Sequence, residues 1–169
     1  MNRNLFITLL IIFNIAIDQI TKVVVRGSMI PGRKGEIDVI GKYFQLIWVE
    51  NKGAFLGMGS DMNPILRLIF LLILPTLVLI YVIYYIVKTK ELDRLSLIAF
   101  CCIVGGGIAN VFDRIVFGEV TDFFFINLGG IFKTGIFNLA DVSVTTGMFM
   151  LLFSSFTKRS TKHTPLETK

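Results

Sequence analysis

The sequence predicts an all-α membrane protein with four transmembrane helices and a small extracytoplasmic β-sheet. Three observations lead to this prediction. The 169-residue chain is 54% hydrophobic and only 17% charged, whereas about a quarter of the residues of a soluble domain are charged. Its mean hydropathy is +0.74. Its apolar residues gather in four runs, each close to the roughly 20 residues that a spanning helix needs.

The four predicted spans are residues 5–25, 65–87, 95–116 and 137–156. No small-residue cleavage site follows the first run, which is interrupted by Asp18 and Lys22. We therefore expect a permanent helix there and not a removed signal peptide. Pro75 lies within the second run and is expected to kink it.

Residues 1–157 are predicted to form a single transmembrane domain, followed by a polar cytoplasmic tail at 158–169. Basic residues concentrate in the cytoplasmic segments of membrane proteins. Here they are denser on the side of both termini, at Arg3, Lys88, Lys90, Arg94, Lys158, Arg159, Lys162 and Lys169. We expect a multi-pass protein of the cytoplasmic (inner) membrane with both termini in the cytoplasm. The net charge of +5 is then a signal of orientation, and no nucleic-acid partner is expected.

Two segments are expected to face outward. In residues 26–64, the runs 37–40 and 43–49 have the composition of short strands, which predicts a small sheet lying on the membrane. Residues 117–136 are rich in glycine and are predicted to be a flexible loop, with Phe123–Phe125 anchored at the membrane interface.

The histidine and cysteine residues favour no metal or thiol chemistry. His163, the single histidine, lies in the polar tail, and Cys101 and Cys102 are adjacent within an apolar run. Nucleophile pairs and zinc motifs that depend on histidine are thereby excluded, and the two cysteines are interpreted as small buried hydrophobic residues. We expect neither a metal nor a cofactor.

Charged and amide side chains interrupt three of the four spans. A charged group at the bilayer centre costs about 2.5–3.5 kcal/mol on insertion scales, so such residues are functional candidates. Within each span they are three or four positions apart, which places them on one helix face. The patches are Asp18 with Lys22, Asn110 with Asp113 and Arg114, and Asn138 with Asp141. They must face one another or water.

These patches are expected at one depth. At about 1.5 Å per residue, Asp18 lies roughly 20 Å into the first span, Asp113 roughly 27 Å into the third and Asp141 roughly 6 Å into the fourth. In a core about 30 Å thick all three fall in the outer third. Asp122 follows just beyond the third span on the same side. We predict one polar layer near the outer surface.

Charge pairing separates the roles of these carboxylates. Two of them have a cation within local reach and are expected to form neutral pairs, Asp18 with Lys22 and Asp113 with Arg114. Asp122 and Asp141 have no such cation, so they are predicted to share one proton. One would then act as general base toward water, and the other as general acid toward the carbonyl oxygen or the leaving amine.

Other interpretations of the same residues remain open at this point. A proton- or cation-coupled carrier could use the same carboxylates, although a carrier needs a midplane site and the cytoplasmic half of each span is apolar. A non-catalytic scaffold would leave the intramembrane charges unexplained. A metal site would have only two free carboxylates as ligands.

Five polar motifs in chain order resemble the lipoprotein signal peptidase (signal peptidase II) family over nearly the whole chain. They are Asp18-Gln19-Ile20-Thr21-Lys22, Asn51-Lys52-Gly53-Ala54-Phe55, Asn110-Val111-Phe112-Asp113-Arg114, Val120-Thr121-Asp122-Phe123 and Phe137-Asn138-Leu139-Ala140-Asp141. By this resemblance Asp122 and Asp141 are the catalytic aspartates, and Asn138 orients them. The positions that would shape or line the substrate cleft are Asp18, Lys22, Asn51, Gly53, Asn110, Asp113 and Arg114.

The resemblance also implies a substrate and a setting. The family removes the signal peptide from diacylglyceryl-modified prolipoproteins, cutting before the lipidated cysteine near the outer leaflet without a metal, and is inhibited by the cyclic peptide globomycin. We therefore expect a monomeric enzyme whose partners are this substrate and membrane lipid. Separately, the glycine-rich loop at 53–60 is expected to close over the peptide. This sequence departs from the family at Gly53-Ala54-Phe55, where a second alanine is usual, and at Ala109, where glycine is usual.

Overall fold

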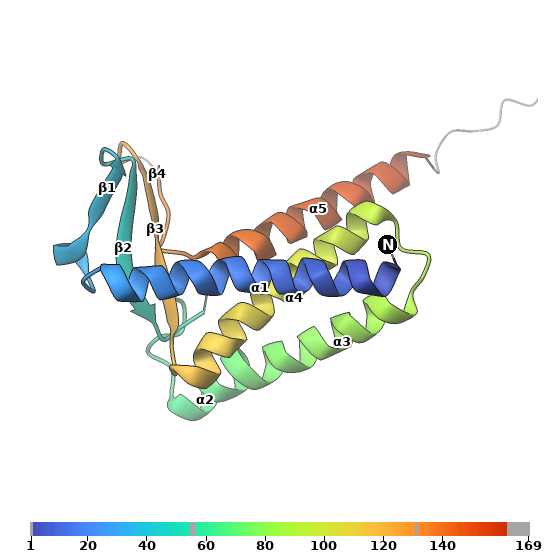
Figure 1. Ribbon diagram of the computed structural model, residues 1–169, viewed down its shortest axis with the longest axis horizontal. Helices are drawn as coiled ribbons and strands as arrows, with labels where there is room; N and C mark the ends of the chain where they lie inside the picture. Colours follow the sequence, from blue (N-terminus) through green and yellow to red (C-terminus); the bar gives the residue numbers. More distant parts are fainter. Residues whose placement is uncertain (1, 55–56, 131, 162–169) are drawn as a thin grey trace, which may run out of the picture.

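The computed structural model describes residues 2–54, 57–130 and 132–161. Long helices run side by side, and a sheet covers one end of the bundle, which we call the sheet end (Figure 1). The helices are α1 (Arg3–Ser28), α2 (Pro64–Leu68), the π-helical turn η3 (Ile69–Ile73), α3 (Leu74–Lys88), α4 (Arg94–Val116) and α5 (Leu139–Thr161). In the described residues, four helical stretches are long and apolar enough to cross a membrane, which confirms the four predicted spans.

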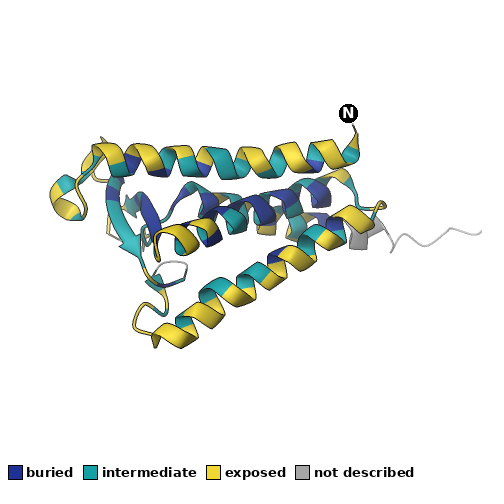
Figure 2. Cartoon of the chain, turned by 60° about the horizontal axis from the view of Figure 1, so that its bottom comes forward, coloured by how far each residue is buried: buried dark blue, intermediate teal, exposed yellow. Residues whose placement is uncertain are grey.

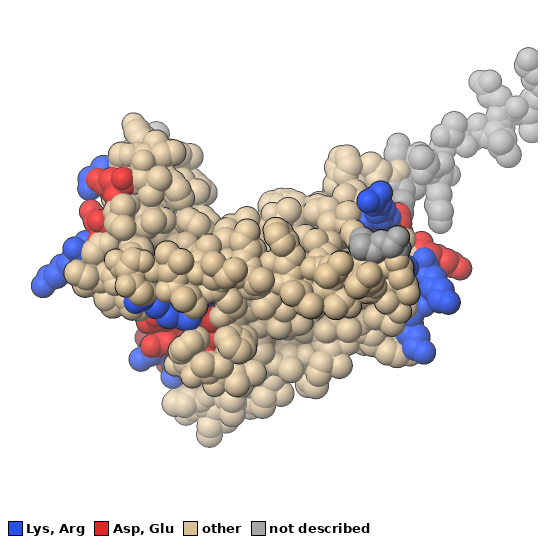
Figure 3. All heavy atoms as spheres, in the orientation of Figure 1, with Lys and Arg blue, Asp and Glu red and all other residues tan. Residues whose placement is uncertain are grey.

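Helix α4 is the centre of the bundle. It contacts α1, α3 and α5, and the buried positions of the chain gather on it, whereas the other helices show exposed outer faces (Figure 2). Small residues permit this close packing, because a Cβ on Gly105 would lie 2.5 Å from the Asn14 Cβ and one on Gly106 would collide with the Ala140 carbonyl oxygen. On the face that Figure 3 shows, the charged side chains lie toward the two ends, and the surface between them is uncharged.

The second span contains the π-helical turn η3, which ends two residues before Pro75, while the kink expected at Pro75 stays a prediction. Proline cannot donate a backbone hydrogen bond, and its ring clashes with the carbonyl group of the preceding turn. A wider turn accommodates that carbonyl. The span Pro64–Lys88 is therefore continuous but irregular in its first half.

The sheet has four antiparallel strands in the order β1-β2-β3-β4. They are β1 (Ile37–Ile40), β2 (Phe44–Asn51), β3 (Val120–Leu128) and β4 (Phe132–Lys133). The strands predicted at 37–40 and 43–49 are confirmed. The flexible loop predicted at 117–136 is wrong, because β3 is an inner strand of the sheet. The glycines of that segment stand at its turns, where Gly118, Gly129 and Gly130 have positive φ angles.

The predicted membrane anchoring of Phe123–Phe125 is also wrong. Phe123 and Phe125 are 3% and 8% exposed, and the Phe124 ring stacks on Phe44 at 5.6 Å between centroids. These rings are therefore packed against other side chains of the protein. At the other end, α5 continues to Thr161, so the predicted tail begins within a helix, and the rest of it lies outside the described residues.

Candidate active site

The start of α5 fixes one carboxylate of the site. Asn138 precedes the helix as its N-cap, and its Oδ1 accepts a hydrogen bond from the Asp141 backbone N–H at 2.9 Å. In return, the Asn138 backbone N–H donates to Asp141 Oδ2 at 3.2 Å. This reciprocal pair is a capping box. The Asp141 carboxylate is thereby held in the first helical turn, at the positive end of the helix dipole.

Asp18 supports the same turn from α1. Its Oδ1 accepts a hydrogen bond from the Ala140 backbone N–H at 2.8 Å, and its Oδ2 pairs with Lys22 at 2.8 Å. Both side chains are fully buried. The predicted pair therefore exists, and Asp18 additionally satisfies one of the N–H groups that a helix start leaves without a partner. Asp18 thus acts on Asp141 by positioning the residue before it.

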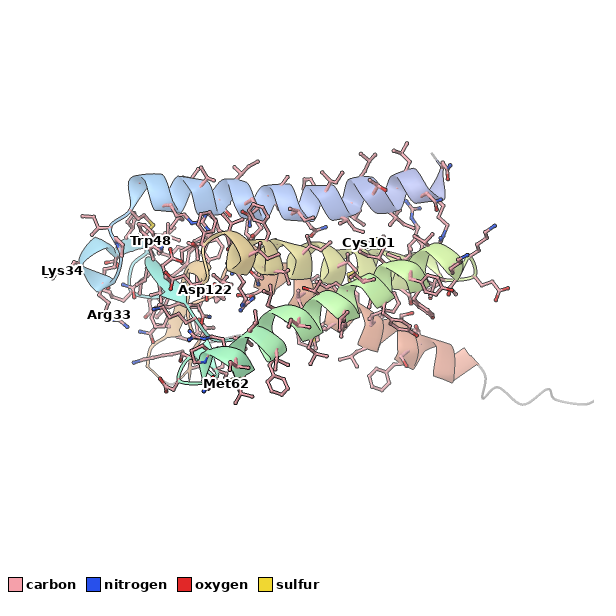
Figure 4. The ribbon with its side chains drawn as sticks, turned by 90° about the horizontal axis from the view of Figure 1, so that it is seen from below. Arg33, Lys34, Trp48, Met62, Cys101 and Asp122 are labelled. Carbon is pink, nitrogen blue, oxygen red and sulfur yellow. The ribbon has the colours of Figure 1, made fainter. Side chains whose placement is uncertain are left out.

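The second carboxylate, Asp122, lies in β3 opposite Val49 of β2. Its Oδ1 accepts from Asn138 Nδ2 at 2.6 Å, and its Oδ2 accepts from Asn51 Nδ2 at 2.8 Å. Asn138 therefore contacts both carboxylates, through its amide nitrogen to Asp122 and through its capping box to Asp141. Figure 4 shows Asp122 at the junction of the sheet and the helices.

Asn110 completes the connection between the carboxylates. Its Nδ2 donates to Asp141 Oδ1 at 2.9 Å. Its Oδ1 accepts from Asn138 Nδ2 at 3.1 Å and from Lys22 Nζ at 2.9 Å. Because two donors bond to the Asn110 oxygen, the orientation of the amide group is fixed. Its nitrogen therefore points to Asp141. Segments far apart in sequence thus meet at one point, as the sequence predicted.

Position 53 has no room for a side chain. A Cβ there would lie 2.5 Å from the Met58 carbonyl oxygen and 2.7 Å from Gly57. Its N–H donates to Asn51 Oδ1 at 2.8 Å, and its carbonyl accepts from Arg114 Nη2 at 2.8 Å. The glycine therefore allows the loop to close on Asn51 and Arg114 together. Residues 55–56 lie outside the described residues, so the predicted closure of loop 53–60 is not tested.

The predicted pair of Asp113 with Arg114 is wrong. Successive residues on a helix do not face each other. Asp113 points to α1, where its carboxylate pairs with Lys22 at 2.8 Å and with Arg26 at 3.3 Å. Arg114 points to the loop at Gly53 instead. The four groups Asp18, Lys22, Arg26 and Asp113 therefore form one balanced cluster of two carboxylates and two cations.

Sequence reasoning missed Arg26 and Thr121. Arg26 Nε donates to Thr121 Oγ1 at 2.8 Å, and the same hydroxyl donates to Glu50 at 3.1 Å. This contact ties α1 to the strand residue that precedes Asp122. A signal was present in the sequence, because Arg26 follows Lys22 by four positions, as Lys22 follows Asp18.

The dyad itself has no ion-pair partner. In the part of the chain that the structure describes, no Lys or Arg nitrogen lies within 4.0 Å of the Asp122 or Asp141 carboxylate. Asp122 is 3% exposed. Burial, and next the nearby charge of Asp141, raise the pKa of Asp122 to about 7. Near neutral pH the Asp122 carboxyl can therefore hold the shared proton that the sequence predicted.

A cavity of about 610 Å³ begins at the two carboxylates. Its polar end is lined by Asn51, Asn110, Arg114, Asp122 and Asp141. Its remaining walls are apolar, with Phe70, Leu71 and Pro75 from the second span and Val144, Met148, Phe149 and Leu152 from α5. The dyad thus stands at the polar end of an apolar groove between these two helices.

No group of three or more His, Cys, Asp and Glu side chains gathers as a metal site in the described part of the chain. Cys101 is buried, as predicted, whereas Cys102 is only half-buried, and both are free thiols. Ala109, one of the departures noted above, is fully buried, so its methyl group fits the packing. Apart from Arg114 and Thr145, the described polar side chains that line the cavity are carboxylates and amides.

Two acid side chains joined by asparagines at the end of an apolar groove, in a four-span bundle, are the arrangement expected of an aspartic peptidase in a membrane. A peptidase family model described as signal peptidase (SPase) II matches residues 10–157. The chain therefore belongs to the signal peptidase II family and has lipoprotein signal peptidase activity. Membership removes the support for the carrier and scaffold interpretations.

Curated relatives agree with this assignment. The chain is 36% identical to the lipoprotein signal peptidase of Clostridium novyi, covering 85% of this chain and 92% of that one. It is 33% identical to the lipoprotein signal peptidase of Borrelia turicatae, covering 93% and 91%. Two solved structures described as bacterial membrane enzymes match the fold. The first has a TM-score of 0.80 at 27% sequence identity, and the match covers 97% of this chain and 94% of that chain. The second has a TM-score of 0.75 at 26% sequence identity, and the match covers 88% of this chain and 91% of that chain.

Replacing Lys22 by methionine is expected to destabilise the protein strongly. The change removes the cation between Asp18 and Asp113 and leaves both carboxylates buried. Removing one partner of a buried ion pair lowers the free energy of unfolding by about 3–5 kcal/mol. Lys42→Met is the matched control, because Lys42 is 69% exposed in its ion pairs and exposed pairs contribute little. Thermal unfolding in detergent should show a large loss for the first variant only. Equal melting temperatures would contradict the buried cluster.

Proposed function

We propose that Asp122 and Asp141 are the catalytic dyad. This dyad hydrolyses the peptide bond that precedes the diacylglyceryl cysteine of a prolipoprotein. The observation that carries this proposal is the position of Asn138, which donates to Asp122 at 2.6 Å and forms the capping box of Asp141. One rigid residue therefore sets the relation of the two carboxylates to each other, as general acid–base catalysis requires.

The proposed reaction needs one proton on the dyad. The ionised carboxylate takes a proton from water as the water oxygen attacks the scissile carbonyl carbon, and the protonated carboxyl donates to the carbonyl oxygen. The tetrahedral intermediate then collapses as its C–N bond breaks. The proton taken from water passes to the leaving amine of the cysteine, and the hydroxyl formed from the carbonyl oxygen returns its proton to the other carboxylate as the C=O bond re-forms. The dyad ends with one proton, as it began.

The groove suits the proposed substrate in its chemistry. The apolar walls formed by Phe70, Leu71, Met148 and Phe149 offer a signal segment or acyl chains the surroundings they have in the bilayer. Its polar end presents Arg114 and the asparagines to the backbone around the scissile bond. The printed names of the relatives, lipoprotein signal peptidase, support this substrate class.

We further propose that the sheet end faces away from the cytoplasm. Basic residues at the opposite end of the bundle, among them Arg3, Lys88 and Arg94, support this orientation because cytoplasmic segments are rich in Lys and Arg. Figure 3 shows blue side chains at that end. The dyad would then lie beneath the outer surface.

Asp122→Asn and Asp141→Asn are each expected to lower the rate of prolipoprotein cleavage by at least about a hundredfold, the scale of general acid–base catalysis. The purified protein and a diacylglyceryl prolipoprotein, analysed by mass spectrometry of the products, provide the assay. Asp38→Asn is the control, because Asp38 lies on the exposed edge strand β1 and should leave the rate unchanged. Full activity in either dyad variant would overturn the assignment.

The cleavage rate is expected to have a maximum in pH. Because the pKa of Asp122 is raised to about 7, the dyad keeps its proton below that pH and loses it above, so the general acid disappears and kcat/KM falls. At low pH the second carboxyl is protonated and the general base disappears. Initial rates on a substrate without ionisable groups near the cleavage site measure both limbs. A rate that continues to rise well above pH about 7 would contradict the shared proton.

A further inference from the structure

A second, smaller cavity lies beside the active site and has a different character. Its volume is about 220 Å³, and we call it the basic cavity. Three cationic side chains line it, Lys52, Arg67 and Arg114, together with Leu68, Leu71 and Leu72. It shares Leu71 and Arg114 with the active-site groove, but the dyad does not line it. A cluster of cations beside leucines requires an explanation that hydrolysis does not supply.

The positive charge of the basic cavity is poorly compensated. Arg67 is half-buried, and among the described residues no carboxylate oxygen lies within 4.0 Å of its guanidinium. Glu119 reaches Lys52 at 4.0 Å while Lys52 remains 63% exposed. Arg114 is held by the Gly53 carbonyl, and the carboxylates of Asp122, Asp141 and Asp113 act on its charge. An anion entering this cavity would therefore find its least compensated cation at Arg67.

The depth of the basic cavity matches the membrane surface. Arg67 is three residues into the span Pro64–Lys88, and Arg114 is two residues from the end of Arg94–Val116, so each lies within about 5 Å of a span boundary. The leucines follow on the bilayer side of Arg67, within η3 and the end of α2. A ligand here would place its anionic group at the boundary and its apolar part against the helix.

We propose that the basic cavity binds the phosphate of an anionic phospholipid headgroup, with an acyl chain along Leu68, Leu71 and Leu72. The phosphate would lie among Lys52, Arg67 and the outer side of Arg114, where basic residues attract anionic lipid. A bound lipid would form part of the wall that the groove shares with the cavity. This inference does not depend on the catalytic proposal, because it concerns a ligand that is not cleaved.

Lipid retention tests the site directly. The full chain, in bilayer discs containing phosphatidylglycerol and phosphatidylcholine, is released into the gas phase and its bound lipids are counted by native mass spectrometry. The parent should retain phosphatidylglycerol preferentially. Arg67→Gln should lower that retention about fivefold, the effect of one cation near a lipid surface. Arg33→Gln is the matched control, because Arg33 is 70% exposed, pairs with Glu36 and does not line the cavity.

Each other outcome would overturn the proposal. Equal losses in the two arginine variants would indicate general surface charge, and unchanged retention in Arg67→Gln would remove the site. Inorganic phosphate added at the same concentration should not displace the lipid, since it lacks the contacts with the leucines. Equal displacement would show a site for free phosphate. The cleavage rate of Arg67→Gln in neutral lipid is measured in parallel. Because the lipid site is separate from the dyad, a lost preference for phosphatidylglycerol with normal cleavage concerns this proposal, and lost cleavage with normal lipid retention concerns the catalytic one.

Discussion

The site depends on a single amide side chain placed at the start of a helix. Asn138 caps α5 and forms the capping box with Asp141, and it also donates to Asp122 in the sheet. A helix start needs such a cap in any case. The side chain that caps the free N–H groups of the helix start therefore also aligns the two carboxylates. One residue contributes both to the stability of the helix and to the geometry of the site.

The buried charges divide into two groups with different tasks. Lys22 and Arg26 are paired with Asp18 and Asp113, which neutralises α1 against α4 inside the bundle. Lys22 and Arg26 already form ion pairs with Asp18 and Asp113. The negative charge of the dyad is therefore stabilised by amide donors and lowered by a shared proton. Asn110 connects the two groups, accepting from Lys22 and donating to Asp141. This arrangement supports the proposal of a singly protonated dyad beside a neutral supporting cluster.

Hydropathy and helical spacing predicted the four spans and the side chains that meet in the polar layer. These signals are local, since each depends on residues three or four positions apart. Strand β3 was missed because its aromatic run between glycines has no alternating pattern, and its inner place depends on pairing with β2 far away in the sequence. The partner of Asp113 was misassigned for a related reason. Arg114 is adjacent in sequence, but the direction of its side chain is set by the helix, and the cations that Asp113 meets come from α1.

The central claim is that Asp122 and Asp141 divide one proton between them. Infrared difference spectroscopy of the protonated carboxyl band, followed through a pH titration of the full chain, tests it most directly. The account predicts that the band disappears with a midpoint near pH 7, where burial and the charge of Asp141 place the pKa of Asp122. It also predicts that Asp141→Asn moves the midpoint to lower pH, because that charge is removed. An unchanged midpoint in Asp141→Asn would show that the two carboxyl groups titrate independently and would contradict the account.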